Sequence, residues 1–229
     1  MTASGNASPS GSGFSERQER YWRRRQRRRD PHHPAVEGFA QPKVEMIRRW
    51  LSDGSPPLIL EAGSGDGYLT HYLRRLGRVV ALDYSLQMLQ ENSCEMRTVG
   101  DAACLPFRDG AFPVVVEANL LHHVPDPLAV VREMRRATRD LVVLIEPNRL
   151  NPLMLALGLA KREERRTLRM CRPYLKRLLE CAGLELFAMV TQGFVTPNRM
   201  PTWLVNCLRR LERPSRVAGY IVAAGRRID

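Results

Sequence analysis

Short apolar runs alternate with amphipathic segments along most of the chain. The apolar runs predict strands, which we place at 58–62, 78–83, 96–99, 113–117 and 140–146. Between them, apolar residues recur at helical spacing. They predict helices at 34–51, 68–76, 86–92 and 126–138. Strands that alternate with helices predict a parallel sheet with helices on both faces.

The pattern changes after residue 146. An amphipathic helix is expected at 172–182, ended by Gly183, and strands are expected at 184–191 and 217–224. The intervening segments are less regular. Residues 149–171 join an apolar run to a charged one, and prolines interrupt 194–214. We expect these two segments to be cap insertions that shape a substrate pocket.

The first predicted strand runs into a glycine-rich turn with Gly63, Gly65 and Gly67, and a helical pattern follows from Tyr68. Glycines let the backbone adopt positive φ and let a ligand approach the main chain. The spacing is G-x-G-x-G, whereas a dinucleotide fingerprint needs its third glycine one position later. No Lys-Ser/Thr pair follows, which also excludes a phosphate-binding P-loop.

The second predicted strand ends in Asp83, twenty residues after Gly63. An acid at this position can accept hydrogen bonds from both hydroxyls of a ribose. A turn that does not hold a pyrophosphate, combined with a ribose-binding acid, favours an adenosine ligand without phosphates.

Four motifs in order carry a resemblance to a known family. They are E-x-G-x-G-x-G at 61–67, ALD at 81–83, Gly100-Asp101-Ala102 with LPF, and LLHHV at 120–124. Together they resemble the class I S-adenosylmethionine-dependent methyltransferases, most of all the type 11 domain that acts on small molecules. The resemblance covers residues 56–146 well and the rest loosely. It implies an α/β, Rossmann-like, doubly wound sheet of seven mostly parallel strands with an antiparallel C-terminal strand.

The resemblance also implies how the cofactor S-adenosylmethionine is held. Gly63 and Gly65 would contact its methionine part through their backbone, and Glu61 would orient the turn or the cofactor's ammonium group. The remaining contacts would come from later loops. Asp83 would bind the ribose hydroxyls with Tyr84 against the adenine, and Asp101 would accept the adenine amino group with the Ala102 N–H nearby. Asp83 and Asp101 have plainer alternatives, as a helix-capping acid and a loop acid.

The segment from Asn119 to His123 follows the fourth predicted strand, so it lies beside the cofactor and the substrate. Asn119 is assigned to the cofactor site. His122 or His123 is a candidate base for a substrate hydroxyl, because imidazole titrates near neutral pH. The alternative is a structural histidine pair. Glu146, at the end of the fifth strand, is expected to point into the cleft and to contact a substrate or pair with an arginine.

The chain departs from the family pattern at two places. Pro113 stands where the family has an acid, so we expect the fourth strand to start differently. The usual Pro-Gly-Gly turn before the fifth strand is replaced by residues 137–140. Both changes lie away from the cofactor-binding motifs.

Composition adds a basic segment. The net charge is +12, and 33 of the 36 basic residues are arginine. Residues 14–30 hold eight arginines and three acids. We expect residues 1–30 to be a disordered or basic arm, and 31–229 to form one methyltransferase domain. An arginine-rich arm is also typical of nucleic-acid binding.

The five cysteines are scattered and form no C-x-x-C pair, which indicates reduced thiols and no zinc site. We predict no metal site. No apolar run reaches the roughly 18 residues of a membrane span, and the N-terminus lacks a signal-peptide core, so we expect a cytoplasmic protein.

Three functions remain open at this point. The first is methyl transfer to a small-molecule or lipid-linked acceptor by direct displacement at the sulfonium methyl. The second is methylation of RNA that the arginine-rich arm binds. The third is a module that binds S-adenosylmethionine without turnover. Acceptor choice, and with it O-, N- or C-methylation, depends on the insertions, where sequence patterns carry least information.

Overall fold

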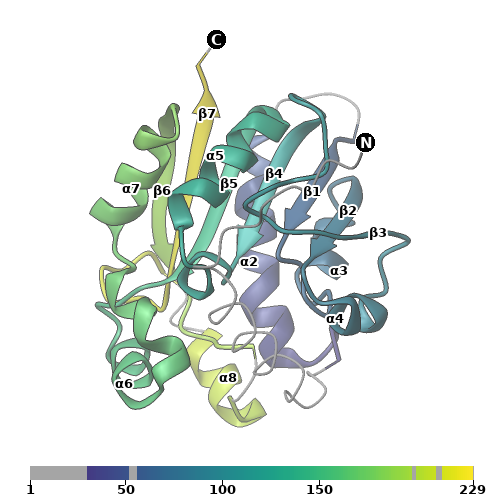
Figure 1. Cartoon of the computed structure of the whole chain (residues 1–229). Helices are drawn as coiled ribbons and strands as arrows, with labels where there is room; N and C mark the ends of the chain where they lie inside the picture. Colours follow the sequence, from purple (N-terminus) through teal and green to yellow (C-terminus); the bar gives the residue numbers. More distant parts are fainter. Residues whose placement is uncertain (1–29, 52–55, 198–199, 210–212, 229) are drawn as a thin grey trace, which may run out of the picture.

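The computed structural model of the chain describes residues 30–51, 56–197, 200–209 and 213–228 (Figure 1). The strands of this part are β1 Leu58–Ala62, β2 Arg78–Asp83, β3 Met96–Val99, β4 Phe112–Ala118, β5 Thr138–Pro147, β6 Leu184–Gln192 and β7 Tyr220–Arg227. Its α-helices are α2 Pro34–Trp50, α3 Thr70–Leu73, α4 Leu86–Glu91, α5 Pro127–Ala137, α6 Pro152–Ala160, α7 Arg172–Cys181 and α8 Thr202–Arg209. Two 3₁₀ helices, η1 Leu121–His123 and η2 Arg162–Arg169, complete it.

The strands form one sheet in the order β3-β2-β1-β4-β5-β7-β6. The pairs from β3 to β5 are parallel, whereas β7 runs antiparallel to both β5 and β6. The strand order reverses between β1 and β4, which marks a topological switch point. The predicted fold class, a doubly wound and mostly parallel sheet with an antiparallel C-terminal strand, is confirmed.

Helices cover both faces of this sheet, because alternate residues of the buried strands point to opposite faces. Ile59 packs with α2, α3 and α4 on one face. Its neighbour Leu60 packs with α5 and α7 on the other. Figure 1 shows α2 behind the sheet and α5 in front of it. Each central strand is therefore apolar on both sides, which explains why the strands appear in the sequence as continuous apolar runs.

The predicted bounds of β1, β2 and β3 are those of the structure. Two other predictions need correction. The helix expected at 68–76 is only Thr70–Leu73, since turns occupy the residues on either side. The last strand, expected at 217–224, begins at Tyr220 because 216–219 form a turn whose Gly219 N–H donates to the Gly193 carbonyl. It continues to Arg227, whose charged side chain hid the strand end from a hydrophobicity pattern.

The start of β4 is irregular, as Pro113 led us to expect. The pairing of β4 with β5 shifts register between Phe112 and Val114. Proline has no N–H to donate to a neighbouring strand, so a bulge at this position is the usual solution. Beyond it the pairing is regular to Ala118, and the carboxyl end of β4 reaches the site undisturbed.

The parallel strands end at the lower edge of the sheet in Figure 1, where α6 and α8 also lie. The two helices belong to the segments predicted as insertions, 149–171 and 194–214; their role as a pocket cap stays a prediction. The predicted arm at 1–30 falls outside the described residues, except for Asp30. Even the apolar α6 has only nine residues, and no helix in the described part of the chain could cross a bilayer.

Candidate functional site

The glycine turn after β1 has the conformation that its sequence predicts. Gly63, Gly65 and Gly67 have φ values of +75°, +54° and +85°. A side chain at Gly63 would also clash with its surroundings, since an added Cβ would lie 2.8 Å from a methyl carbon of Leu120. The turn therefore needs glycine for its backbone conformation and for space.

Asp83 is joined to this turn by a hydrogen bond. Its Oδ2 accepts from the Gly65 N–H at 2.8 Å, and its Oδ1 accepts from the Ser85 N–H at 2.8 Å. The carboxylate is half-buried at the carboxyl edge of the sheet, beside the switch point. Ser85 itself caps α4 through Met88 N–H, as predicted from the sequence. Ser85, and not Asp83, is therefore the N-cap residue of α4. Asp83 instead accepts a hydrogen bond from the glycine turn.

Glu61 lies beneath the turn and is almost fully buried. Thr70 Oγ1 donates a short hydrogen bond to its Oε2. The Asn92 side-chain amide donates to Thr70 Oγ1 at 3.2 Å and to the Gly65 carbonyl at 3.4 Å. Glu61 therefore orients the turn through Thr70 and Asn92. Asn92 was not predicted as a site residue, because it follows α4 and belongs to no sequence motif. Only the fold shows that it is completely buried.

Burial raises the pKa of Glu61 to about 8, and the negative charges of Asp83 and Asp66 act in the same direction against the opposing hydrogen bond from Thr70. A carboxyl group with a raised pKa keeps its proton in the folded state while the unfolded chain releases it. Its contribution to stability is complete below the unfolded pKa of 4.5 and is lost as pH rises through about 8.

We therefore expect Glu61→Gln to flatten the pH dependence of stability. The free energy of unfolding of the unmodified protein should fall by about 1–3 kcal/mol more than that of the variant between pH 5 and pH 9. Urea unfolding of both proteins at the two pH values measures this, with Glu163→Gln, an exposed position, as the control. Parallel pH profiles for Glu61→Gln and the unmodified protein would show that Glu61 is already ionised in the fold.

Asn119 stands directly after β4 in the left-handed region, with φ of +57°, unlike any other non-glycine residue in the described part of the chain. Its side-chain amide donates to the Tyr68 hydroxyl at 3.0 Å, and its N–H donates to the Ile145 carbonyl at 2.8 Å. Backbone strain of this kind clusters at ligand sites. The contact joins the end of β4 to the glycine turn and places Asn119 with the predicted cofactor residues.

The residues predicted to contact adenine lie further along the same edge. Tyr84 is 55% exposed, and Asp101 is exposed, with its Oδ1 accepting from the Ala103 N–H at 2.8 Å. Ala102, the next residue after Asp101, is buried. Tyr84 and Asp101 follow the adjacent strands β2 and β3, so both belong to the edge that holds Asp83.

A buried cluster of ionisable side chains lies at the ends of β4 and β5. His122 Nδ1 is 2.6 Å from Glu146 Oε2, and His122 Nε2 is 3.5 Å from Glu164 Oε2 in η2. The imidazole rings of His122 and His123 are in contact, with centroids 3.9 Å apart. Glu146 therefore pairs with a histidine and not with an arginine, so that alternative was wrong, while a contact with a substrate stays a prediction. Glu164 was not predicted as a site residue, because it lies in the charged run 161–166 and the sequence does not show which glutamate of that run is buried.

The charges of this cluster depend on one another. Burial alone would lower the pKa of His122, but the charge of Glu146 and the hydrogen bonds to Glu146 and Glu164 outweigh it and raise the pKa to about 9. Glu117, at the end of β4, is fully buried and shares a hydrogen bond with Glu146. Burial raises the pKa of Glu117 well above its ordinary value, and the charge of Glu146 adds to the effect. His122 is thus a charged partner of Glu146 near neutral pH.

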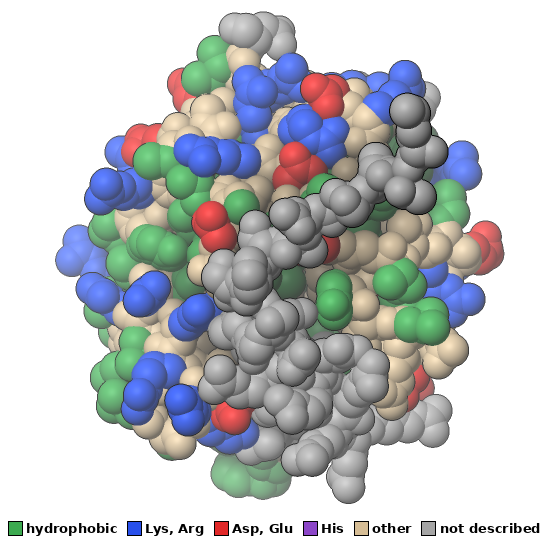
Figure 2. Space-filling view, viewed as in Figure 1, with side chains coloured by type: hydrophobic (Ala, Val, Ile, Leu, Met, Phe, Trp, Pro, Cys, Tyr) green, Lys and Arg blue, Asp and Glu red, His purple; other side chains and the backbone are tan. Residues whose placement is uncertain are grey.

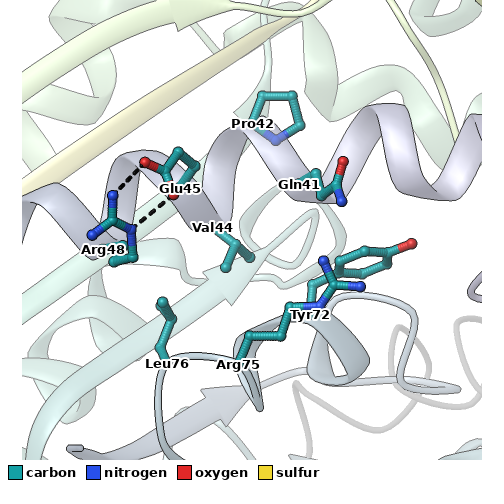
Figure 3. Close-up of a pocket in the computed structure, with 8 residues that line it drawn as sticks. All are labelled: Gln41, Pro42, Val44, Glu45, Arg48, Tyr72, Arg75 and Leu76. Atoms are coloured by element: carbon teal, nitrogen blue, oxygen red, sulfur yellow. Dashed lines mark hydrogen bonds and ion pairs between the residues drawn. The ribbon is translucent and has the colours of Figure 1, made fainter.

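A groove of about 450 Å³ lies elsewhere, between α2 and α3 (Figure 3). Its lining includes Tyr72 and Arg75 from the α3 region, and Glu45 from α2, which is paired with Arg48 at 2.7 Å. None of the predicted site residues lines it. The groove is therefore separate from the residues that the sequence predicts for the site.

Basic side chains on the visible face of the described residues lie in several separate places. Figure 2 shows Lys and Arg near the top, at the left and at the lower left, mixed with hydrophobic and acidic side chains. The predicted RNA-binding segment, 14–30, lies outside the described residues apart from Asp30.

Comparisons with known proteins agree with this architecture. Residues 60–145 match a family described as a methyltransferase domain. The match begins within β1, ends within β5 and contains all four sequence motifs, so these residues match the family that the motifs predict. A demethylmenaquinone methyltransferase from Mycolicibacterium paratuberculosis is 35% identical over 95 residues, which are 40% of this chain and 41% of that protein.

A ubiquinone biosynthesis O-methyltransferase from Xanthomonas oryzae pv. oryzae is 28% identical over 168 residues, 67% of this chain and 63% of that protein. The chain thus spans less than two thirds of the curated relatives that it matches. Among solved structures, an S-adenosylmethionine-dependent methyltransferase of Thermotoga maritima, a possible histamine N-methyltransferase, has a TM-score of 0.66 at 16% identity, covering 94% of this chain and 97% of that one. Geranyl diphosphate C-methyltransferase of Streptomyces coelicolor has a TM-score of 0.62 at 16% identity, covering 97% and 100%. These two structures share the fold.

Proposed function

We propose that this protein, whose residues 60–145 belong to the methyltransferase domain family, is an S-adenosylmethionine-dependent methyltransferase acting on a small-molecule or lipid-linked acceptor. The observation that carries the proposal is the hydrogen bond from the Gly65 N–H to Asp83, which joins the glycine turn to the acid after β2 at the switch point of the sheet. Ligands of open α/β sheets bind at this point.

The residues present suit S-adenosylmethionine. Asp83 offers carboxylate oxygens to the ribose hydroxyls, and Asp101 offers an acceptor to the adenine amino group. The positive-φ turn of Gly63 and Gly65 lets the ligand approach backbone groups closely. When bound, S-adenosylmethionine supplies a sulfonium methyl group that an acceptor nucleophile takes by direct displacement. Rate then comes chiefly from alignment, which contributes on the order of 7–11 kcal/mol in well-oriented reactions.

The acceptor end of the site is assigned to the segment after β4. Asn119 contacts Tyr68, which follows the glycine turn, and Leu120 packs against Gly63. His122 and His123 come two and three residues after Leu120 in the chain. In this proposal His123 is the candidate for taking the acceptor's proton, because the raised pKa of about 9 leaves His122 already protonated near neutral pH. With both its nitrogens facing carboxylates, His122 acts together with Glu146 and Glu164 and not as an isolated base.

An apolar acceptor is supported by the insertion beside the site. Leu153, Leu155 and Leu159 of α6 are 53%, 42% and 63% exposed. The names of the two curated relatives place them in demethylmenaquinone methylation and ubiquinone biosynthesis. Exposed leucines next to a methyl-transfer site suit an acceptor with a hydrocarbon chain.

A transfer assay tests this function. The full chain is incubated with S-adenosylmethionine labelled in its methyl group and with phenolic quinols carrying short or long prenyl chains. We expect labelled quinol from the unmodified protein, and at least a 100-fold lower rate from Asp83→Ala. Total RNA serves as the competing acceptor. Label in RNA alone, or no label in any acceptor, would contradict the proposed acceptor class.

A further inference from the structure

Three buried side chains from separate parts of the chain converge at the ends of β4 and β5. His122 and His123 come from η1, and Glu164 comes from η2. Each offers a nitrogen or oxygen ligand atom, and these atoms all lie within 4.8 Å of one another. All three residues are at most 8% exposed. Two ligand atoms bound to one ion at about 2.1 Å lie roughly 3–3.5 Å apart, so small side-chain movements would bring all three onto one ion.

The surroundings orient His122 as a ligand. Its Nδ1 faces Glu146 at 2.6 Å, and this leaves Nε2 directed at Glu164, 3.5 Å away. Glu146 is itself held by the Leu121 N–H, which donates to its other oxygen at 2.7 Å. Histidines that bind metals characteristically donate their second ring N–H to a carboxylate, which fixes the ring and strengthens the ligand. Glu146 has this place relative to His122, and the Nε2 of His122 would release its proton when the ion binds.

The charge of the cluster also favours a cation. Glu117, Glu146 and Glu164 bring three carboxyl groups into a space from which water is largely excluded, next to two imidazoles. Buried carboxylates are costly unless they are paired or coordinate a metal. A divalent ion between Glu164 and the two histidines would place positive charge beside these carboxyl groups.

We propose that His122, His123 and Glu164 form a binding site for one divalent transition-metal ion. Two imidazoles and one carboxylate suit zinc or iron, whereas magnesium and calcium favour sites made of oxygen ligands alone. Three protein ligands leave a coordination position open, as in catalytic sites. This proposal replaces the expectation of no metal site. The long separation of Glu164 from the histidines in the chain hid the site from a search for spacing motifs.

The role of the ion rests on the proposed function. His122 comes two residues after Leu120, which packs on Gly63. An ion bound to His122 would contact the acceptor's hydroxyl oxygen and lower the pKa of that hydroxyl group. The acceptor hydroxyl would give its proton to the hydroxide that it replaces on the ion, and this hydroxide would leave as water. The acceptor oxygen would form the new bond to the methyl carbon, and the sulfur–methyl bond would break. The substrate would then be activated without a free histidine base.

Cobalt titration tests the site without any cofactor. The untagged full chain is treated with a chelator, dialysed and titrated with Co²⁺, followed by its visible absorption and by displacement with Zn²⁺. We expect one Co²⁺ per chain with nitrogen and oxygen ligands. His123→Ala and Glu164→Gln should each weaken binding at least tenfold. Both variants keep the His122–Glu146 pair, and circular dichroism checks that they fold.

Two control variants make the same kinds of substitution outside the proposed metal site. Glu163→Gln removes the neighbouring exposed carboxylate, and His71→Ala removes a histidine whose ring contacts His32, with centroids 4.8 Å apart. Both should bind Co²⁺ as the unmodified protein does. Absence of stoichiometric binding, a sulfur-to-cobalt absorption band, or equal binding by Glu164→Gln would each overturn the site. His122 with its two glutamates would then be a structural ion triad.

The outcomes separate this inference from the proposed function. Metal binding is measured without S-adenosylmethionine, and cofactor binding is measured without metal. A protein that binds Co²⁺ at this site but transfers no methyl group would retain the metal site and contradict the methyltransferase. A protein that methylates acceptors at full rate after chelation would overturn the role of the ion.

Discussion

Asp83→Ala should weaken binding of S-adenosylhomocysteine by at least 100-fold. The substitution removes the carboxylate expected to accept two ribose hydroxyls, and hydrogen bonds to a charged group contribute about 1.5–3 kcal/mol each. It also removes the acceptor for the Gly65 N–H, which loosens the glycine turn. Calorimetric titration of the two proteins measures the difference.

Two further variants make this result specific. Asp83→Asn keeps one oxygen acceptor for the turn but loses the charge, so it should bind with intermediate affinity. Asp109→Asn changes an exposed acid that precedes β4, at the opposite edge of the sheet, and should bind normally. If Asp83→Ala binds within threefold of the unmodified protein while remaining folded, the ribose does not lie at Asp83.

Gly67→Ala should cost about 2–4 kcal/mol of folding stability. The residue has φ of +85°, and an added Cβ would lie 2.4 Å from Asn92 Oδ1 and 2.5 Å from its Cγ. Asn92 has little room to move, because it is fully buried and hydrogen-bonded to Thr70 and to the Cys94 N–H. Strain at a special backbone position combined with a buried clash belongs to the largest classes of single-residue effects. Urea unfolding of both proteins measures the loss.

Gly110→Ala is a matched control for the backbone effect. Gly110 also has positive φ, at +61°, but an added Cβ would meet only Arg139 Cβ at 3.7 Å, an ordinary contact. It should cost about 1 kcal/mol, the part due to φ alone. Equal losses at the two positions would mean that Asn92 does not brace the turn. In that case Asn92→Ala would also leave cofactor binding unchanged.

Much of the fold was predictable because the central strands are buried on both faces. Leu58–Ala62 and Arg78–Asp83 are mostly apolar and are ended by a glycine turn or an acid, so their bounds could be predicted. The end of the last strand was predicted too early because the strand ends in Arg226 and Arg227. The backbone of these residues pairs with β6 and β5, although their side chains are charged. Hydrophobicity patterns do not register such a strand end.

The candidate site divides in the same way. Gly63, Gly65, Asp83 and Asp101 could be predicted because glycine turns and acids after successive strands form recognisable motifs, and their roles at a ligand stay predictions. Glu117, Glu164 and Asn92 were not predicted, since their importance comes from burial and from partners far along the chain. Glu146 was noticed for its position, but its partner was predicted incorrectly, because only the fold brings η1 against the end of β5.

The most direct test of the central claim is calorimetric titration of the purified full chain with S-adenosylhomocysteine and, separately, with NAD. The glycine spacing and the acid after β2 predict one molecule of S-adenosylhomocysteine bound per chain in the micromolar range, and no heat from NAD. Binding of NAD in place of S-adenosylhomocysteine, or binding of neither, would contradict a methyltransferase site at the carboxyl edge of this sheet.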